Sequence, residues 1–143
     1  MIEIGITATR RGATDAQIAT LTRMLRNLYP VALHHGDCVG GDEDAHNVAV
    51  SLKIRTVAHP PDITKLRAWC LADRTKTPAP YLKRNEDIVH STNALFAMPR
   101  QDKEPDAKKA RGSGTWYTVR FARKIGRPVT IIWPDGSVPL EEQ

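Results

Sequence analysis

The 143-residue sequence has only two cysteines, Cys38 and Cys70, and only 6% of its residues are aromatic. Two cysteines do not build the disulfide framework of a small secreted protein, so we expect both thiols to be reduced. The start of the chain lacks the pattern of a signal peptide, and no apolar run approaches the about 20 residues that span a bilayer. We therefore expect a cytoplasmic protein with no membrane partner.

The composition is otherwise that of a globular domain, with 41% apolar and 26% charged residues. We expect one nucleotide-binding domain over 1–135 and a short tail at 136–143. Lys and Arg outnumber Asp and Glu by 21 to 16, which gives a net charge of +5. This excess favours an anionic partner such as a nucleotide, a phosphate or a nucleic acid, although a solvated surface explains it about as well.

Apolar runs alternate with amphipathic segments along the chain. Patterns typical of strands cover 2–7, 31–35, 54–59, 93–99 and 128–133. Helical patterns begin at Thr14, Asp42, Pro80 and the G-S-G-T segment, and a further short helix is expected within 64–72. The alternation predicts a single-domain Rossmann-like α/β fold, a doubly wound sheet of about five mainly parallel strands with helices on both faces. Such sheets bind ligands at the carboxyl ends of their strands.

The segment R-G-S-G-T follows the fourth predicted strand and opens a helix. Glycines let a ligand approach the backbone, hydroxyls can donate to phosphate, and the free N–H groups of a helix start attract anions. An arginine adds a charged donor. The expected anion site comprises Arg111, Gly112, Ser113, Gly114 and Thr115, and the alternative is a capping turn that binds nothing.

The loop T-A-T-R-R-G follows the first predicted strand, where nucleotide-binding α/β proteins usually hold phosphate. It contains neither G-x-G-x-x-G nor the G-K-[ST] of an ATPase loop, so ATP hydrolysis and ordinary dinucleotide binding lose support. Thr7, Thr9 and Arg10 are its candidate contacts to phosphate or ribose.

Acidic and imidazole side chains crowd the segment H-H-G-D-C-V-G-G-D-E-D-A-H at 34–46. No pair has the H-x-x-x-H or C-x-x-C spacing of a zinc site, so we predict no metal here. Its acidic residues can instead accept hydrogen bonds from ribose hydroxyls. The weak candidates for catalysis are Asp37, Asp42, Asp44 and His46.

Three segments together resemble, in this order, the SLOG superfamily of Rossmann-like nucleotide-binding domains: H-G-D-C-V-G-G-D-E-D-A-H-N-V-A, R-N-E-D-I-V-H-S-T-N-A-L-F-A-M-P and G-S-G-T-W-Y-T-V-R-F-A-R-K-I-G-R-P-V. That superfamily includes the cytokinin-activating lonely-guy hydrolases, the DNA-processing protein DprA and stand-alone domains of the YspA/YpsA-related type, which match best in size. The resemblance implies a nucleotide-type ligand between the G-S-G-T segment and the first loop, and a homo-oligomer. Besides that segment, the resemblance places in the ligand site Gly36, Gly40, Gly41, Asp42, Arg84 and Asn85. Asp37 of the acidic loop is a further candidate contact to the ligand.

The departures from the superfamily concern activity. Lonely-guy hydrolases carry P-G-G-x-G-T-x-x-E, and the position of the glutamate is Thr118 here. Threonine cannot replace a carboxylate in proton transfer, so that hydrolase mechanism is not expected. The likeness to DprA is limited to Gly40–His46.

These observations favour a binding module for a nucleotide or nucleotide-derived signal, ADP-ribose-like or cyclic, that acts as a sensor or sequestering protein. One alternative is a hydrolase of N-glycosidic or phosphoester bonds that uses the acidic loop. A second is a DprA-like binder of single-stranded nucleic acid. No further cofactor is expected.

Overall fold

The computed structural model describes residues 1–108 and 114–139, so Arg111, Gly112 and Ser113 lie outside the described residues. All strand pairs of the sheet are parallel, in the order β4-β3-β2-β1-β5-β6. The strands are β1 (Glu3–Ala8), β2 (Ala32–His35), β3 (Arg55–Ala58), β4 (Arg74–Thr75), β5 (Ala94–Met98) and β6 (Val129–Ile131). The helices are α1 (Asp15–Leu28), α2 (Gly41–Ser51), α3 (Tyr81–His90) and α4 (Gly114–Lys124), with a 3-10 turn, η1 (Thr64–Leu66). The predicted α/β class is confirmed.

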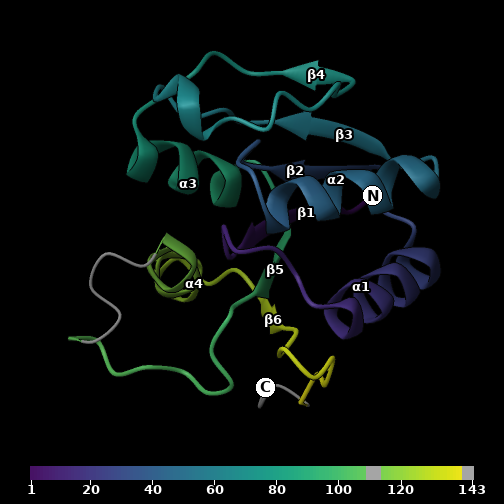
Figure 1. Cartoon of the computed structure of the whole chain (residues 1–143), viewed down its shortest axis with the longest axis vertical. Coiled ribbons are helices and arrows are strands. Elements are labelled where there is room, and N and C mark those ends of the chain that lie inside the picture. Colours follow the sequence, from purple (N-terminus) through teal and green to yellow (C-terminus); the bar gives the residue numbers. More distant parts are fainter. Residues whose placement is uncertain (109–113, 140–143) are drawn as a thin grey trace.

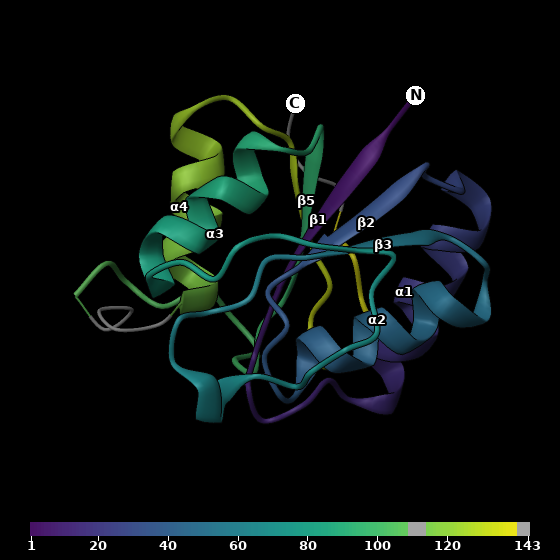
Figure 2. The same cartoon turned by 90° about the horizontal axis from the view of Figure 1, so that it is seen from above.

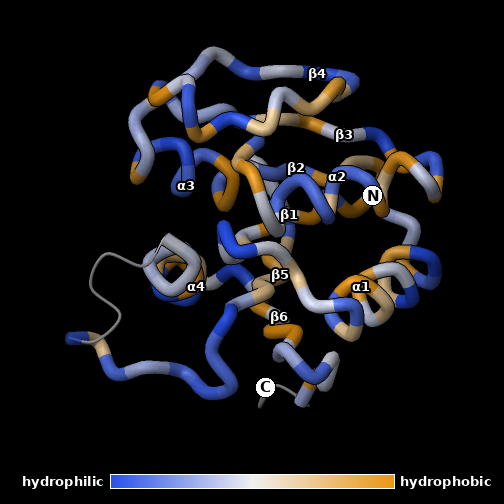
Figure 3. Tube along the Cα trace, viewed as in Figure 1, coloured by the Kyte–Doolittle hydropathy of each residue, from blue (hydrophilic) through white to orange (hydrophobic). Residues whose placement is uncertain are grey.

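Helices cover both faces of the sheet, α1 and α2 on one side and α3 and α4 on the other (Figures 1 and 2). Each face buries its own apolar cluster. Leu21 and Leu25 of α1 pack with Val48 of α2 against β1, whereas Trp116 and Val119 of α4 pack on β5 and β6. Figure 3 shows apolar and hydrophilic residues sharing the circumference of α1, as expected for a helix that buries one side.

The start of α1 follows the predicted capping box. The Thr14 hydroxyl accepts from the Gln17 N–H at 3.0 Å, and the Gln17 side chain accepts from the Thr14 N–H at 2.9 Å. Gln17 is itself buried and donates to the carbonyls of Pro99 and Ile132, both at 2.9 Å. The cap therefore also fixes α1 to the chain beyond β5 and β6.

The segment between β3 and α3 differs from the prediction. The short helix expected within 64–72 is only the 3-10 turn η1, because the backbone is already extended at Arg67 (φ −75°, ψ 140°), and Trp69 then has a left-handed φ of 57°. The sixth strand, β4, was not predicted; it pairs through only Arg74 and Thr75 with the edge of β3.

The order of the strands reverses at β1, which lies between β2 and β5. The chain leaves β1 toward α1 on one face and reaches α4 from β5 on the other (Figure 2). A crevice outside the carboxyl ends of these two strands is the usual ligand position in such sheets. Among the described residues, no helix is both long and apolar enough to cross a bilayer.

Candidate functional site

A cleft opens at this reversal point, outside the carboxyl ends of β1 and β5. It lies between the first loop, the start of α3 and the start of α4. The lining includes these predicted ligand contacts: Thr7, Thr9, Arg10, Gly36, Asp42, Arg84, Asn85, Gly114 and Thr115. Residues separated by up to about a hundred positions in the sequence thus meet in one site.

Arg84 reaches the cleft from the first turn of α3 and is only 3% exposed. Its Nη1 donates to the carbonyls of Gly36 and of His59, the latter at 3.2 Å, and its terminal nitrogens lie 3.6 and 3.7 Å from Cys38 Sγ. Its Nε has no hydrogen-bond partner. Among the described residues no carboxylate forms an ion pair with it. Because an unpaired buried cation is costly, this arrangement favours an anionic ligand.

Gly36 is a position of close approach. A Cβ there would collide with Arg84 Nη1 and would lie 2.7 Å from Asp42 Oδ2. The guanidinium and the carboxylate therefore reach the cleft only because residue 36 has no side chain.

Asp42 is the acidic residue that the structure places in the cleft, from the first turn of α2. Its carboxylate accepts from the Cys38 N–H at 3.3 Å. Burial raises its pKa from 3.8 to about 6, against the opposing effect of the nearby Arg84. A carboxyl group with a pKa close to neutrality is suited to proton transfer.

The starts of α3 and α4 meet at Tyr81. The Arg10 guanidinium lies 5.0 Å from the centre of the Tyr81 ring, and that of Arg84 lies 5.5 Å from it. A Cβ on Gly114 would collide with the Tyr81 hydroxyl, so the first residue of α4 has to be small for the two helix starts to come together. The backbone N–H groups there add to the positive potential of the cleft.

Seven of the described lining residues were not predicted, and four of these carry a polar or thiol side chain: Cys38, Tyr81, Arg100 and Gln101. Arg100 and Gln101 come shortly after β5, beyond Pro99, and a position soon after a parallel strand is the signal that points to them. Gln101 is oriented by the Trp116 indole, whose Nε1 donates to its side chain at 3.0 Å. For Tyr81, the only sequence signal that could have pointed to the cleft is its position at the start of a predicted helix.

Gly40 and Gly41 lie beneath the first loop and do not line the cleft. The Gly41 N–H donates to the Thr9 carbonyl at 2.8 Å, and a Cβ on Gly41 would collide with the Ala8 side chain. Gly40 has a φ of 98°, and a Cβ there would collide with the Arg10 carbonyl. Both glycines hold the loops after β1 and β2 together.

Three of the catalytic candidates lie away from the cleft lining. Asp37 is fully buried and accepts two hydrogen bonds of 2.8 Å from the segment 67–70. Asp44 accepts from a backbone N–H ahead of α1 at 2.8 Å, and His46 contacts the ring of His35. The Asp42 carboxylate is thus the one candidate acid that the described chain brings to the cleft.

Thr118 lies on α4 and is 1% exposed. Its hydroxyl donates to the Gly114 carbonyl at 2.7 Å, one turn earlier in the same helix. The hydroxyl is therefore engaged within its own helix.

The fold and the cleft define a Rossmann-like α/β protein with a cationic site at the point of strand reversal. No protein-family model matches the sequence, and no curated protein matches it significantly. Solved structures do share its fold. The molybdenum cofactor binding protein of the phototrophic bacterium Rippkaea orientalis is 21% identical with a TM-score of 0.71, over 92% of this chain and 76% of that one.

Two further structures have the same architecture. The molybdenum cofactor carrier protein of Chlamydomonas reinhardtii is 19% identical with a TM-score of 0.65, over 91% of this chain and 75% of that one. DNA processing protein A (DprA) of Streptococcus pneumoniae is 16% identical with a TM-score of 0.67 over 92% of this chain, which spans 50% of that protein. These likenesses confirm the fold that the resemblance to the SLOG superfamily implies.

Proposed function

We propose that the chain binds a phosphate-bearing small molecule of the nucleotide class in the cleft, as a sensor, carrier or sequestering protein. The observation that carries the proposal is Arg84, a guanidinium that is 3% exposed, lines the cleft and keeps its Nε without a partner. A phosphate in the cleft would bring the opposite charge, which no described carboxylate supplies to Arg84 in an ion pair.

The surroundings of Arg84 support an anion. Arg10 and Arg100 line the same cleft, and the first N–H groups of α4 open beside it. Asp42 is the acid among the described lining residues; with a pKa of about 6 it is mostly ionised at pH 7, so it sets one negative charge against the three lining arginines. The cleft holds about 170 Å³, below the roughly 300–1,000 Å³ typical of sites that enclose a whole small molecule. It suits a phosphate and its sugar better than an entire dinucleotide.

The structural neighbours widen the choice of ligand. Two of them are proteins that bind or carry the molybdenum cofactor, on the same fold and with most of this chain superposed. We therefore add that cofactor to the candidates AMP, ADP-ribose, NAD and cyclic nucleotides.

A thermal-shift screen against this panel tests the proposal. A ligand present at 100 times its dissociation constant stabilises the folded state by about 2.7 kcal/mol, which is readily seen as a higher Tm. Replacing Arg10 with Ala removes a cation of the cleft, whereas Arg11→Ala removes the adjacent exposed cation outside the lining. We expect at least a tenfold loss of affinity for Arg10→Ala and less than a twofold change for Arg11→Ala. No stabilising ligand in the panel, or equal effects of the two variants, would overturn the proposal.

One observation favours a second function, hydrolysis of a nucleotide bond. Asp42 lies in the same cleft with a pKa raised to about 6, so its carboxylate is placed to accept a proton from an attacking water. Mass spectrometry of ligand mixtures after incubation would reveal products. Turnover by the wild-type protein that falls at least 100-fold in Asp42→Asn, with binding retained, would establish this function; an unchanged ligand would exclude it.

A further inference from the structure

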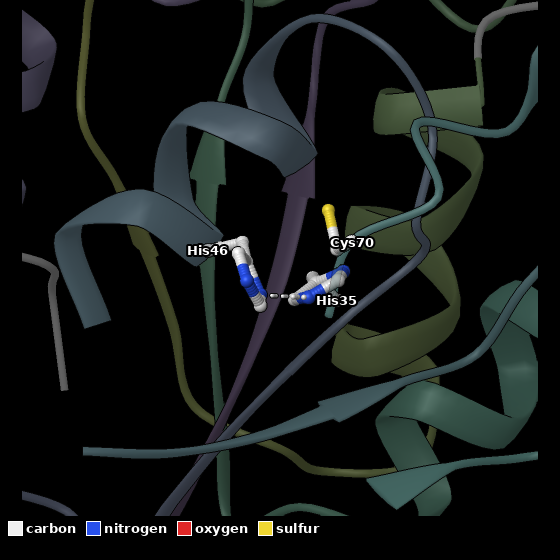
Figure 4. Close-up of side chains that lie close together, drawn as sticks. All are labelled: His35, His46 and Cys70. Atoms are coloured by element: carbon white, nitrogen blue, oxygen red, sulfur yellow. Dashed lines mark hydrogen bonds between the residues drawn. The ribbon is translucent and has the colours of Figure 1, made fainter. Parts of the chain in front are cut away.

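A cluster of metal-ligating side chains lies outside the cleft and is not used by the proposed function. His35 ends β2, His46 lies in the middle of α2, and Cys70 comes from the segment between η1 and β4. One ligand atom from each residue lies within 4.8 Å of the other two. Figure 4 shows the two imidazole rings joined by a hydrogen bond, with Cys70 beside them.

The spacing of these three residues in the sequence does not reveal that they form a cluster. The two histidines are on different elements, and the cysteine arrives from a loop. Asp37 brings that loop in, because its carboxylate accepts from the Arg67 side chain and from the Cys70 N–H, both at 2.8 Å. The cluster is therefore built by the fold and does not follow a local motif.

The distances are close to those of a coordination site. His35 Nε2 and His46 Nδ1 are 3.1 Å apart, and two nitrogens bound to one tetrahedral zinc ion at about 2.0–2.1 Å are separated by about 3.3 Å. An inward movement of Cys70 by about 1 Å would bring its sulfur to zinc–sulfur distance from the same point. Cys70 is half-buried and its N–H is held by Asp37, so this movement has to come from the Cys70 side chain.

The protonation states also bear on metal binding. Burial lowers the pKa of His35 to about 3 and lowers that of His46, so both rings are neutral at pH 7, the form that binds metals. Burial, and next the Asp37 carboxylate, raise the pKa of Cys70 to about 12, so its thiol keeps its proton until a cation displaces it.

The competing explanation is a hydrogen-bond network without metal. His35 Nδ1 accepts from the Asp37 N–H at 3.0 Å, so His35 carries its proton on Nε2 and donates it to His46. A metal bound to Nε2 would move that proton to Nδ1 and sacrifice the bond from Asp37. The metal would also replace the hydrogen bond from His35 to His46. Two hydrogen bonds together contribute less free energy than the coordination of a zinc ion, so their loss does not prevent binding.

We propose that His35, His46 and Cys70 bind one zinc-class divalent cation per chain. Two imidazole nitrogens and one thiolate are a donor set that suits Zn²⁺. Binding releases the thiol proton of Cys70, while the proton of His35 moves from Nε2 to Nδ1. A hollow lined by Glu43 and Trp69 adjoins His46 and Cys70, and a water from it would supply the fourth ligand.

Titration of chelator-treated, tag-free protein with Co²⁺ and then Zn²⁺ tests the site. We expect one Co²⁺ per chain, a thiolate-to-cobalt charge-transfer band in the near ultraviolet, and displacement of the cobalt by Zn²⁺. Cys70→Ser should abolish that band, and His46→Gln should weaken Zn²⁺ binding at least 100-fold. The matched controls Cys38→Ser and His90→Gln change the other cysteine and an exposed histidine, and they should bind as the wild type does.

Circular dichroism of each variant separates loss of the site from loss of the fold. If His46→Gln fails to fold, the partly exposed Cys70 alone still decides the matter through the charge-transfer band. No metal bound by the wild-type protein, or the same band in Cys70→Ser, would overturn the proposal. Neither result bears on ligand binding by Arg84, which the thermal-shift panel measures separately.

Discussion

Arg84 and Gly36 show how single residues determine the cleft. A buried guanidinium needs acceptors, and two backbone carbonyls and one sulfur supply part of them. The remaining donor, Nε, has no partner, and the guanidinium keeps its place because residue 36 has no Cβ to collide with Nη1 and Cζ. Sequence alone predicts a cation before β5 but not its burial, which depends on loops that come together only in the folded chain.

Gly36→Ala tests this dependence. The added Cβ would displace the Arg84 guanidinium and the Asp42 carboxylate, with a stability loss of about 1–3 kcal/mol typical of overpacking. We expect ligand affinity to fall at least tenfold, measured by isothermal titration with the tightest ligand of the panel. Urea unfolding shows whether the variant is folded under those conditions. Unchanged affinity in a folded variant would mean that Arg84 does not contact the ligand.

Asp42 makes the free energy of unfolding depend on pH, and the direction of its pKa shift sets the sign of that dependence. Its pKa is about 6 in the folded chain against 3.8 for an ordinary carboxyl. The folded state therefore binds the proton more tightly, and the stabilisation from this group is complete below pH 3.8 and lost as pH rises through about 6. A change of this size corresponds to about 3 kcal/mol.

The variant Asp42→Asn isolates that effect, because the amide does not titrate. The histidines with lowered pKa act in the opposite direction over the same pH range, but they are common to both proteins. We expect the free energy of unfolding of the variant, relative to wild type, to improve by about 3 kcal/mol between pH 4 and pH 7. Urea titrations at unit steps of pH measure it, and a constant difference would contradict the raised pKa.

At the scale of elements, the loops after β1 and β2 form one unit. Gly40 has a φ of 98° and lies against the Arg10 carbonyl, whereas Gly126, with a φ of 82° after α4, has no atom within 4 Å of an added Cβ. Gly40→Ala should therefore cost about 3 kcal/mol and Gly126→Ala about 1 kcal/mol, since only the first adds a collision to the backbone strain. Chemical denaturation of the two variants compares them directly. Equal losses would show that the loops separate readily.

The long elements of this chain could be predicted from its sequence, and the short ones could not. The capping box and apolar spacing of α1 are local signals, and the structure has both. β4 has two exposed residues in a turn-rich segment and no apolar alternation, so only its pairing with β3 reveals it. Trp69 lacks any local sign of its left-handed φ, which left the segment between η1 and β4 open to a helical interpretation.

In the candidate site, too, local sequence signals predicted some residues and only tertiary contacts reveal the others. Strand-end positions pointed to Thr7, Arg10 and Thr115, because the topology of a parallel sheet brings such positions to one edge. Tyr81 lines the cleft through its ring, which lies beside Arg10. Asp37 does not line the cleft, because its carboxylate is bound to Arg67 in the segment between η1 and β4. Such contacts depend on tertiary structure, which periodicity does not encode.

For the whole molecule, the net charge of +5 favours an anionic partner, and a small phosphate ligand and a single-stranded nucleic acid are the two classes to compare. The fold does not separate them, since molybdenum cofactor proteins and DprA share it. The cleft does favour one class: its cations converge on a small volume, whereas a strand of nucleic acid needs phosphate contacts spread along a groove.

Salt dependence distinguishes the two partners. A ligand held by one or two phosphates should lose less than about tenfold in affinity between about 50 and 200 mM salt, whereas a strand with about five phosphate contacts should lose about 100-fold. We expect the shallow dependence for the tightest ligand of the panel by isothermal titration. Fluorescence anisotropy of a labelled single-stranded oligonucleotide over the same salt range serves as the comparison. Tight oligonucleotide binding that weakens steeply with salt and is unaffected by Arg10→Ala would show that the positive charge of the protein serves nucleic-acid binding. The cleft would then not have its proposed role.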